Sequence, residues 1–333
     1  ISSDIITELY EDVKGDIWIG TENGLNRYRL SKGTIMQLLA DGSDNGLSHN
    51  AVTAICGDRQ GVIWVGTALG LNRIDSASRK NRQFFMKDGK NSINHNRISA
   101  LLYDNKGSLW IGTMGGGLTL HNPELNQFTH LKSKSDNALN YITALIDDSH
   151  DKLWIGTAFG GLYHFNKSSG QFKNHRQDSN NRHSISDNRI NDLFLGRDRV
   201  LWIATQNGLN RFSPTDHRFR AYKRNIAEPH SISFDVVTTV FIDHSNSLWV
   251  GTRGRGLNKY SKHEHIFKTF KPEAKNPHSL NNSFVYPILE DRHQRLWIGT
   301  QGGGINRISR DRSHYQFYKN SAGDINSISS DFI

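Results

Sequence analysis

Seven tryptophans stand in this chain, and each of them begins the same four-residue phrase, Trp-Ile/Val-Gly/Ala-Thr. Successive tryptophans are separated by 46, 46, 44, 48, 47 and 48 residues. Self-similarity at a nearly fixed period of this length is typical of repeat architectures, so we expect seven copies of one structural unit. The residues that carry the repeat are assigned structural roles: Trp18, Trp64, Trp110, Trp154, Trp202, Trp249 and Trp297.

Each copy of the unit reads as four short strands. In the second copy, an apolar run at 52–56 ends in a turn-forming cluster, a second run covers 62–66, and strands at 71–74 and 82–87 complete the unit. No segment shows a sustained helical period, and glycine and proline fall between the runs. Four antiparallel strands in about 40–50 residues are the plan of a propeller blade. The sequence therefore predicts an all-β fold, a seven-bladed β-propeller with four antiparallel strands per blade.

The blades are expected to follow one another without a break. We predict a single propeller over residues 1–326, with blades at about 1–45, 46–91, 92–137, 138–183, 184–230, 231–278 and 279–326. The opening Ile-Ser-Ser-Asp-Ile-Ile recurs near the end as Ile-Ser-Ser-Asp-Phe-Ile, so residues 327–333 are predicted to start a following repeat of a longer chain. Closure would then depend on packing between the first and seventh blades.

The repeated phrase has a packing interpretation. The tryptophan is expected to fill the gap between neighbouring sheets, and the glycine two residues later to leave room for a large ring. In three copies the usual acid-to-glycine turn is altered, at 148–151, 195–200 and 291–295, which puts the conformation of those turns in doubt. A second set of glycines, beyond the threonine, is expected at positive φ or in close backbone contacts: Gly24, Gly70, Gly117, Gly161, Gly208, Gly256 and Gly304.

Composition excludes few classes of function. The formal net charge is +9, but the basic residues are scattered among acids, so we expect no nucleic-acid partner. No apolar run approaches the roughly 18 residues that a membrane-spanning helix needs, and we expect no membrane segment in this piece. The single cysteine, Cys56, lies in an apolar run and is expected to pack as a small buried hydrophobe.

Catalytic and metal-binding patterns are weak. Most of the 16 histidines stand singly, and the tight pair His263 and His265 lacks an evident third ligand. The acidic turns are interpreted as carboxylates that accept backbone N–H bonds, not as glycosidase pairs. The glycine runs 115–117 and 302–304 precede strands, unlike phosphate-binding loops. We therefore expect no catalytic residues, no metal and no cofactor in a non-enzymatic chain.

The repeat resembles a known family. The segment Asp-Asn-Lys-Gly-Ser-Leu-Trp-Ile-Gly-Thr at 104–113, the Gln-Gly-Gly-Gly-Ile-Asn-Arg run at 301–307 and Ser-Ile-Ser connections at 183–188 and 230–235 resemble the two-component regulator propeller repeat. The resemblance implies a periplasmic ligand-sensing module of a bacterial membrane-bound regulator, with a histidine kinase or cyclic-dinucleotide output elsewhere. It also implies an oligosaccharide or other small polar ligand. Downstream domains of the same polypeptide and a homodimer are the expected protein partners.

Residues that vary where the architecture repeats are the candidates for ligand binding. Asn50, Asn96, Asn140 and Asn188, with Asp4 and Asp235 in equivalent places, are interpreted as turn caps, and their neighbours differ from copy to copy. Arginines suit bidentate binding of carboxylate or sulfate, and aromatic rings offer flat apolar faces. We predict a small anionic ligand, such as a uronic-acid or sulfated oligosaccharide, at the mouth of the central channel. The predicted residues are Arg97, Tyr141, Phe159, Arg189, Arg253, Arg255 and Phe284.

Three alternatives stay open at this stage. The seven candidate residues can equally be ordinary exposed or inter-blade side chains. The propeller can be a non-catalytic protein–protein scaffold, with sensing done by other domains. A lyase or glycosidase propeller is the third alternative, although no non-repeated cluster of His, Glu and Asp is evident near the predicted channel mouth.

Overall fold

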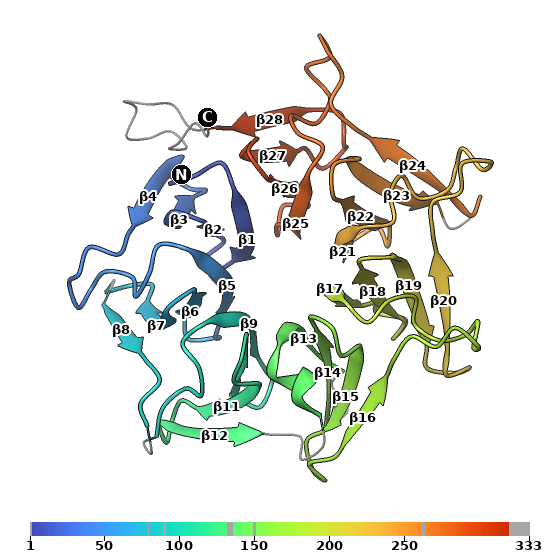
Figure 1. The fold of residues 1–333 in the computed structure, drawn as a ribbon. Helices are drawn as coiled ribbons and strands as arrows, with labels where there is room; N and C mark the ends of the chain where they lie inside the picture. The colour runs from blue at the N-terminus through green and yellow to red at the C-terminus, as the bar shows by residue number, and fades with distance from the viewer. Residues whose placement is uncertain are drawn as a thin grey trace. The chain divides into compact units, whose positions relative to one another are not determined.

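The structure is a computed structural model that describes residues 2–78, 80–88, 91–131, 136–148, 151–261 and 264–319. These residues form seven four-stranded antiparallel sheets, each with its strands in chain order (Figure 1). The predicted seven-bladed β-propeller with four strands per blade is confirmed. The predicted start of a further repeat at 327–333 lies outside the described residues.

The first three blades each contain four strands. Their strands are β1 (Ile6–Glu11), β2 (Ile17–Thr21), β3 (Gly24–Arg29), β4 (Thr34–Leu38), β5 (Val52–Gly57), β6 (Val62–Thr67), β7 (Gly70–Asp75), β8 (Asn81–Phe84), β9 (Ile98–Tyr103), β10 (Leu109–Thr113), β11 (Leu118–Asn122) and β12 (Gln127–Leu131). A 3-10 turn, η1 (Asn137–Asn140), leads into the fourth blade.

The other four blades repeat the plan. Their strands are β13 (Ile142–Asp147), β14 (Lys152–Thr157), β15 (Leu162–Asn166), β16 (Phe172–His175), β17 (Ile190–Leu195), β18 (Leu201–Thr205), β19 (Gly208–Ser213), β20 (Arg218–Tyr222), β21 (Val237–Ile242), β22 (Leu248–Thr252), β23 (Leu257–Ser261), β24 (Ile266–Phe270), β25 (Val285–Glu290), β26 (Leu296–Thr300), β27 (Ile305–Ile308) and β28 (Tyr315–Tyr318).

The chain divides into two compact units. The first contains the chain up to Ile142, together with Gly299–Arg307 and the strand residues from Gln316. The second contains Thr143–Ile298 and Ile308–Tyr315. The second strands β6, β10, β18 and β22 are buried at every residue, as expected of strands that are covered on both faces.

The tryptophans pack between sheets, as predicted. Trp64 is 1% exposed and contacts Phe84 of its own blade and His121 of the next, with ring centroids 5.9 and 5.3 Å away. The reason given for the following glycine was wrong. A Cβ on Gly66 would stand 2.4 Å from Ile98 Cγ2, and one on Gly112 would stand 2.5 Å from Ile142 Cγ2. The space is therefore taken by a β-branched aliphatic residue of the next inner strand, not by a ring.

The acidic turns are held as predicted. Asp104 Oδ1 accepts hydrogen bonds from the backbone N–H groups of Lys106 and Ser108, both at 3.0 Å. Its Oδ2 accepts the indole N–H of Trp110 at 2.8 Å. One carboxylate thus satisfies a turn and fixes the tryptophan ring.

The doubt about the altered turns was unfounded, because the chain keeps the turn without the glycine. Asp151, Arg199 and Gln294 adopt φ of 61, 61 and 63° in these turns. The seventh-blade turn is closed by hydrogen bonds from the N–H groups of His293 and Arg295 to Asp291 Oδ1. A left-handed residue other than glycine costs some strain, which the turn contacts offset. The glycines predicted beyond the threonine all have positive φ, between 71 and 123°.

Candidate functional site

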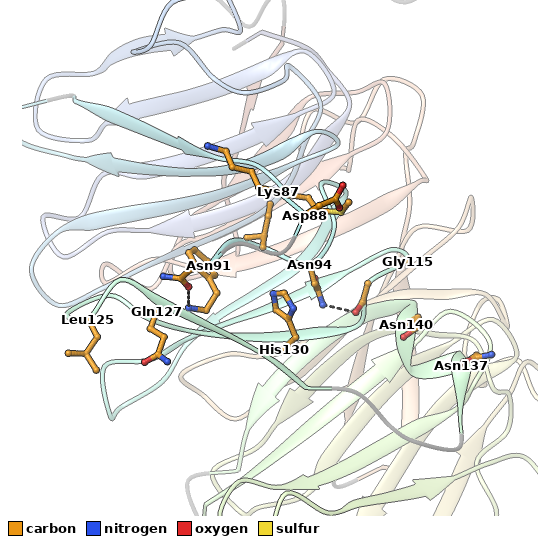
Figure 2. Close-up of a pocket in the computed structure, with 14 residues that line it drawn as sticks. Lys87, Asp88, Asn91, Asn94, Gly115, Leu125, Gln127, His130, Asn137 and Asn140 are labelled. Carbon is orange, nitrogen blue, oxygen red and sulfur yellow. Dashed lines mark hydrogen bonds between the residues drawn. The ribbon is translucent and has the colours of Figure 1, made fainter.

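A polar groove is lined by residues of the first unit alone. Its volume is about 1110 Å³, slightly above the roughly 300–1,000 Å³ of typical small-molecule sites. It lies beside the third blade, between the connection that precedes β9 and the η1 turn (Figure 2). Its lining residues are Met86, Lys87, Asp88, Asn91, Ile93, Asn94, Gly115, Gly116, Leu125, Gln127, Phe128, His130, Asn137 and Asn140.

The connection from β8 to β9 forms one side of the groove. Ile93 anchors it, because its side chain is fully buried in the apolar cluster around Trp64. The N–H of Met86 donates to Asn96 Oδ1 at 2.6 Å, and the N–H of Lys87 donates to Ser92 Oγ at 3.0 Å. The backbone N–H groups of Met86 and Lys87 are therefore held by side chains that follow them in the connection.

The base of the groove departs from the repeat. In the second blade Ser48 exchanges two hydrogen bonds with Asn72, a pairing that recurs in the fifth and sixth blades. In the third blade Asn94 stands in the place of the serine and Thr119 in the place of the asparagine. Asn94 instead donates through Nδ2 to the carbonyl oxygen of Gly116 at 2.6 Å, and its Oδ1 has no partner among the described residues.

The η1 turn forms the opposite side. Asp136 accepts the N–H of Ala138 at 3.0 Å, which caps the turn, and Leu139 is buried beneath it. The carbonyl oxygen of Asn140 accepts the N–H groups of Gly115 and Gly117 at 2.7 and 3.1 Å. The Asn140 side chain is thereby placed at the groove by its own backbone, as Figure 2 shows. The prediction that Asn140 caps a turn holds for its carbonyl.

Strand β12 and the turn before it close the groove. Asn91 fixes this turn, since its Nδ2 donates to the carbonyl of Asn126 and its Oδ1 accepts the N–H of Phe128, both at 2.6 Å. His130 Nε2 lies 2.8 Å from the carbonyl oxygen of Ser92. The Phe128 ring stacks on His121 with centroids 4.1 Å apart. The groove thus has an apolar strip next to its amides.

Electrostatics around the groove are balanced. Among the described lining residues, Lys87 is the one lysine or arginine and Asp88 the one carboxylate, so their formal charges cancel. Beneath the groove, burial lowers the pKa of His121 to about 4, and this ring is therefore neutral at physiological pH. The sequence did not predict this groove. The signal that could have found it is the loss of the third-strand asparagine in two consecutive blades, at Thr119 and Tyr163.

The seven predicted ligand-binding residues fall into three groups in the structure. In the first group, Arg97 and Tyr141 flank Met114. The N–H of Met114 donates to the carbonyl oxygen of Arg97 at 2.9 Å, and Met114 forms an isolated bridge with Tyr141. Both side chains are exposed, and neither lines the polar groove.

Phe159 and Arg189 form the second group. They line a depression of about 360 Å³ with Gln177, Ser186, Asp187, Asn188 and Asn207. Arg189 makes a bidentate pair with Asp187, at 3.0 Å from Nε and 2.8 Å from Nη2. This carboxylate already occupies the guanidinium face that an anionic ligand would use.

Arg253, Arg255 and Phe284 form the third group. Arg253 and Phe284 face each other across an isolated bridge, and the Phe284 ring covers Gly254. All three side chains are exposed. Among the described residues, neither arginine makes an ion pair, so this group keeps the positive charge that the sequence prediction needs.

Other kinds of site were sought in the part of the chain that the structure describes. No group of three or more His, Cys, Asp or Glu side chains there could hold a metal ion. His263 of the tight histidine pair lies outside the described residues. None of the described helical residues forms a segment with the length and apolarity needed to span a membrane.

Comparison with known families settles the nature of the repeat. Residues 1–23, 46–68, 92–115 and 279–302 each match the two component regulator propeller family. The chain carries two component regulator propeller repeats. Each matched segment contains the connection, the inner strand, the acidic turn and the tryptophan strand of one blade, so the family pattern coincides with the packing described above.

Solved structures share the propeller fold. An extracellular domain assigned to the hybrid two component system BT3049 of B. thetaiotaomicron superposes with a TM-score of 0.80 at 23% identity, over 93% of this chain and 40% of that one. A second extracellular domain, of the one component system BT4673 of the same organism, gives 0.56 at 18% identity, over 99% and 54%. The propeller-repeat chain therefore spans about half or less of these two proteins.

A propeller enzyme is also similar in fold. Virginiamycin B lyase from Staphylococcus aureus superposes with a TM-score of 0.65 at 13% identity, over 89% of this chain and 92% of that one. At such identities the likeness extends to the fold alone. No curated protein sequence matches the chain.

Proposed function

We propose that this chain is the extracytoplasmic sensor propeller of a bacterial membrane-bound signalling protein, and that it binds a saccharide or another small polar ligand without catalysing a reaction. The observation that carries the proposal is the polar groove beside the third blade, with its fixed backbone and outward amide side chains. The propeller repeats and the extracellular regulator domains of similar fold support it.

The groove suits recognition better than chemistry. Its amide and imidazole groups come from Asn91, Asn94, Gln127, His130, Asn137 and Asn140, while Asp88 is the one carboxylate among the described lining residues. General acid–base catalysis of glycoside cleavage commonly uses two carboxyl groups that flank the bond. A pocket with several amides and one carboxylate is equipped to hold polar groups in place, which is what a sensor requires.

Signalling would require that ligand binding favours one arrangement of the protein over another. A ligand shifts such an equilibrium only to the extent that it binds the two arrangements unequally. The groove joins the β10–β11 turn to the η1 turn through Gly115 and Asn140, so an occupant would contact both of these turns of the first unit.

A thermal-shift screen with calorimetry on each hit tests the proposal. Ligands that bind only the native state stabilise it by RT ln(1 + [L]/Kd), so a true ligand raises Tm with dose and saturates in calorimetry. Turnover of a hit is followed by chromatography. Saturable binding without turnover is the expected result. Cleavage of the ligand would favour the lyase or glycosidase alternative, and no binding across a broad panel would favour the scaffold alternative.

A further inference from the structure

We infer that the second unit carries a binding site for phosphate groups, in a cleft between the outer strands of the sixth blade and the β27–β28 turn at 309–314. Two cavities of about 510 and 290 Å³ form this cleft, and Arg312 lines both of them. The inference goes beyond the proposed sensor function and does not rest on it. We call the site the cationic cleft, after its lysine and arginine residues: Lys259, Lys268, Lys271, Arg310 and Arg312.

Positive charge is concentrated in the second unit. Its sequence contains 24 lysines and arginines against 16 aspartates and glutamates, whereas the first unit contains 17 against 16. The formal net charge of the chain, +9, is therefore divided into +8 and +1. Such an asymmetry between two parts of a chain is typical of proteins whose basic part has an anionic partner.

Arg312 is held in place by acids of the neighbouring turns. Its Nη2 donates to Asp243 Oδ2 at 3.1 Å and to Glu290 Oε1 at 2.9 Å. Its Nη1 donates to the carbonyl oxygen of Gln294 at 2.9 Å. Asp243 also accepts the indole N–H of Trp249 at 2.8 Å. These two acids are thus bound to Arg312 and to N–H groups, and neither of them lines the two cavities.

The other four cations of the cleft make no ion pair with a described residue. Lys259 stands directly opposite Lys268 in the register of β23 and β24, and like charges in this relation repel each other. Lys271 and Arg310 are exposed on either side of this pair of lysines. The adjoining residues 262–263 lie outside the described part of the chain, and their sequence, Lys-His, contains no carboxylate. An anion in the cleft would relieve the repulsion.

Two carboxylates line the cleft, and each is engaged by its own turn. Asp311 accepts the hydroxyl groups of Ser309 and Ser313. Glu273 Oε2 accepts the side-chain N–H of Asn276 at 2.7 Å. The five lysines and arginines outnumber these two carboxylates by three, before any histidine is protonated. The cleft therefore has charge to offer to an ion that carries more than one negative charge.

The donors suit a phosphate group better than a carboxylate. A carboxylate is best held by a bidentate guanidinium, and that of Arg312 is already paired with two carboxylates. Lysines, in contrast, bind phosphate as point charges. His244 Nδ1 lies 2.7 Å from Glu290 Oε1, and His314 Nδ1 lies 2.7 Å from Ser313 Oγ. Each ring therefore keeps its Nε2 for an occupant.

The imidazoles also distinguish phosphate from sulfate. A phosphate monoester loses its second proton with a pKa of about 6, so near neutral pH it both donates and accepts hydrogen bonds. A neutral imidazole Nε2 that accepts such a bond, as His244 and His314 are placed to do, gains nothing from a fully ionised sulfate. The cleft is therefore expected to prefer phosphate over sulfate.

The experiment measures binding of inorganic phosphate, pyrophosphate and tripolyphosphate to the whole chain by calorimetry at constant ionic strength. Sulfate and a polyglutamate peptide are the competing anions. A second arm measures cosedimentation with phosphatidylcholine vesicles that contain or lack phosphatidic acid. Each ligand is tested on Lys259→Gln and Lys268→Gln. The matched control is Lys173→Gln, an exposed lysine at the equivalent position of the fourth blade, opposite His164.

The cleft variants are expected to bind pyrophosphate roughly 10-fold more weakly, because one charge-assisted hydrogen bond is lost, and the control is expected to bind it unchanged. Without ligand, both cleft variants should have a Tm equal to or above that of the wild type, since the repulsion between the two lysines is removed. A loss of affinity is then not a loss of folding. Binding to free phosphates supports a soluble phosphorylated ligand, and binding to phosphatidic acid alone supports a lipid headgroup.

The other outcomes overturn the inference. The absence of saturable binding in both arms would exclude a phosphate site. Equal weakening by Lys173→Gln would show general attraction to a basic unit and refute the location. Equal affinity for sulfate or for polyglutamate would refute the selection of phosphate. Each of these results leaves the polar groove and the proposed sensor function untouched, because the two sites share no residue.

Discussion

The Nδ2 group of Asn94 donates a hydrogen bond to the carbonyl oxygen of Gly116 at 2.6 Å, where the second blade instead pairs Ser48 with Asn72. Asn94 stands in the place of the serine. It bonds to the β10–β11 turn of its own blade, whereas the serine of the second blade bonds to the third strand. This replacement places at the base of the groove an amide whose oxygen has no hydrogen-bond partner among the described residues. The groove thus arises where one blade departs from the repeat, since the serine–asparagine pair of the second, fifth and sixth blades is replaced there.

The first prediction concerns this contact. Asn94→Ala should lower the free energy of unfolding by about 1 kcal/mol, because one side-chain to backbone hydrogen bond is lost. It should also weaken binding of a groove ligand, since the Gly115–Gly116 turn loses its support. Urea denaturation and calorimetry measure the two effects. Unchanged stability and affinity would show that the contact does not hold the turn.

A second prediction concerns the acidic turns. Asp104→Ala should destabilise the protein by about 3 kcal/mol or more, because three donors around a 5%-exposed carboxylate lose their acceptor. Asp58→Ala should cost less. Asp58 accepts two backbone N–H groups, but Trp64 Nε1 has no partner among the described residues. Equal losses in urea denaturation would contradict a role for the indole contact.

A third prediction tests the glycine of the tryptophan phrase. Gly112→Ala should cost about 1–3 kcal/mol through overpacking, since its Cβ would stand 2.5 Å from Ile142 Cγ2. The fifth blade already carries Ala204 at this position, fully buried, so Ala204→Gly serves as the reverse variant. It should also destabilise, because it removes a packed methyl group. A neutral Gly112→Ala variant would mean that neighbouring strands adjust freely.

The fourth prediction is a pH dependence. Asp192 accepts hydrogen bonds from Thr239 Oγ1 and the Val240 N–H at 2.8 and 3.0 Å, and burial raises its pKa from 3.8 to about 6. Between these two values the native state binds more protons than the unfolded state, so the contribution of Asp192 to stability falls as pH rises from about 4 to 6. The unfolding free energy of the wild type minus that of Asp192→Asn should therefore decrease over this range. A flat difference would contradict the raised pKa.

Much of the fold could be predicted from the sequence because the same strand and turn pattern occurs seven times, once in each blade. The strands of the second blade, the carboxylate turns and the positive-φ glycines all follow from local chemistry. The residue that packs against Gly66 could not be predicted, because this residue, Ile98, belongs to the next blade. The conformation of the altered turns was also misjudged. Asp151 and Gln294 adopt the left-handed backbone conformation that glycine adopts in the other turns, although residues with a side chain disfavour it.

The candidate site was harder to predict for a physical reason. Arginines and aromatic residues near a presumed channel mouth stood out by residue type, yet Arg189 is already paired with Asp187. The groove instead depends on asparagines such as Asn140, whose sequence position indicates only a turn cap. Its two sides are brought together by the hydrogen bonds of Gly115 and Gly117 to a single carbonyl. These contacts join segments that are more than 20 residues apart, and the sequence alone does not show that the segments lie side by side.

Hydrogen exchange measured by mass spectrometry, with and without a saturating oligosaccharide hit, tests the central claim most directly. The account predicts slower exchange in peptides from the segments that line the groove, at 86–88, 91–94, 115–116, 125–130 and 137–140, and little change elsewhere. Protection centred on 187–189, or on 253–255 and 284, would place the ligand at the arginine groups instead. Protection at neither location in the presence of a bound ligand would contradict both assignments.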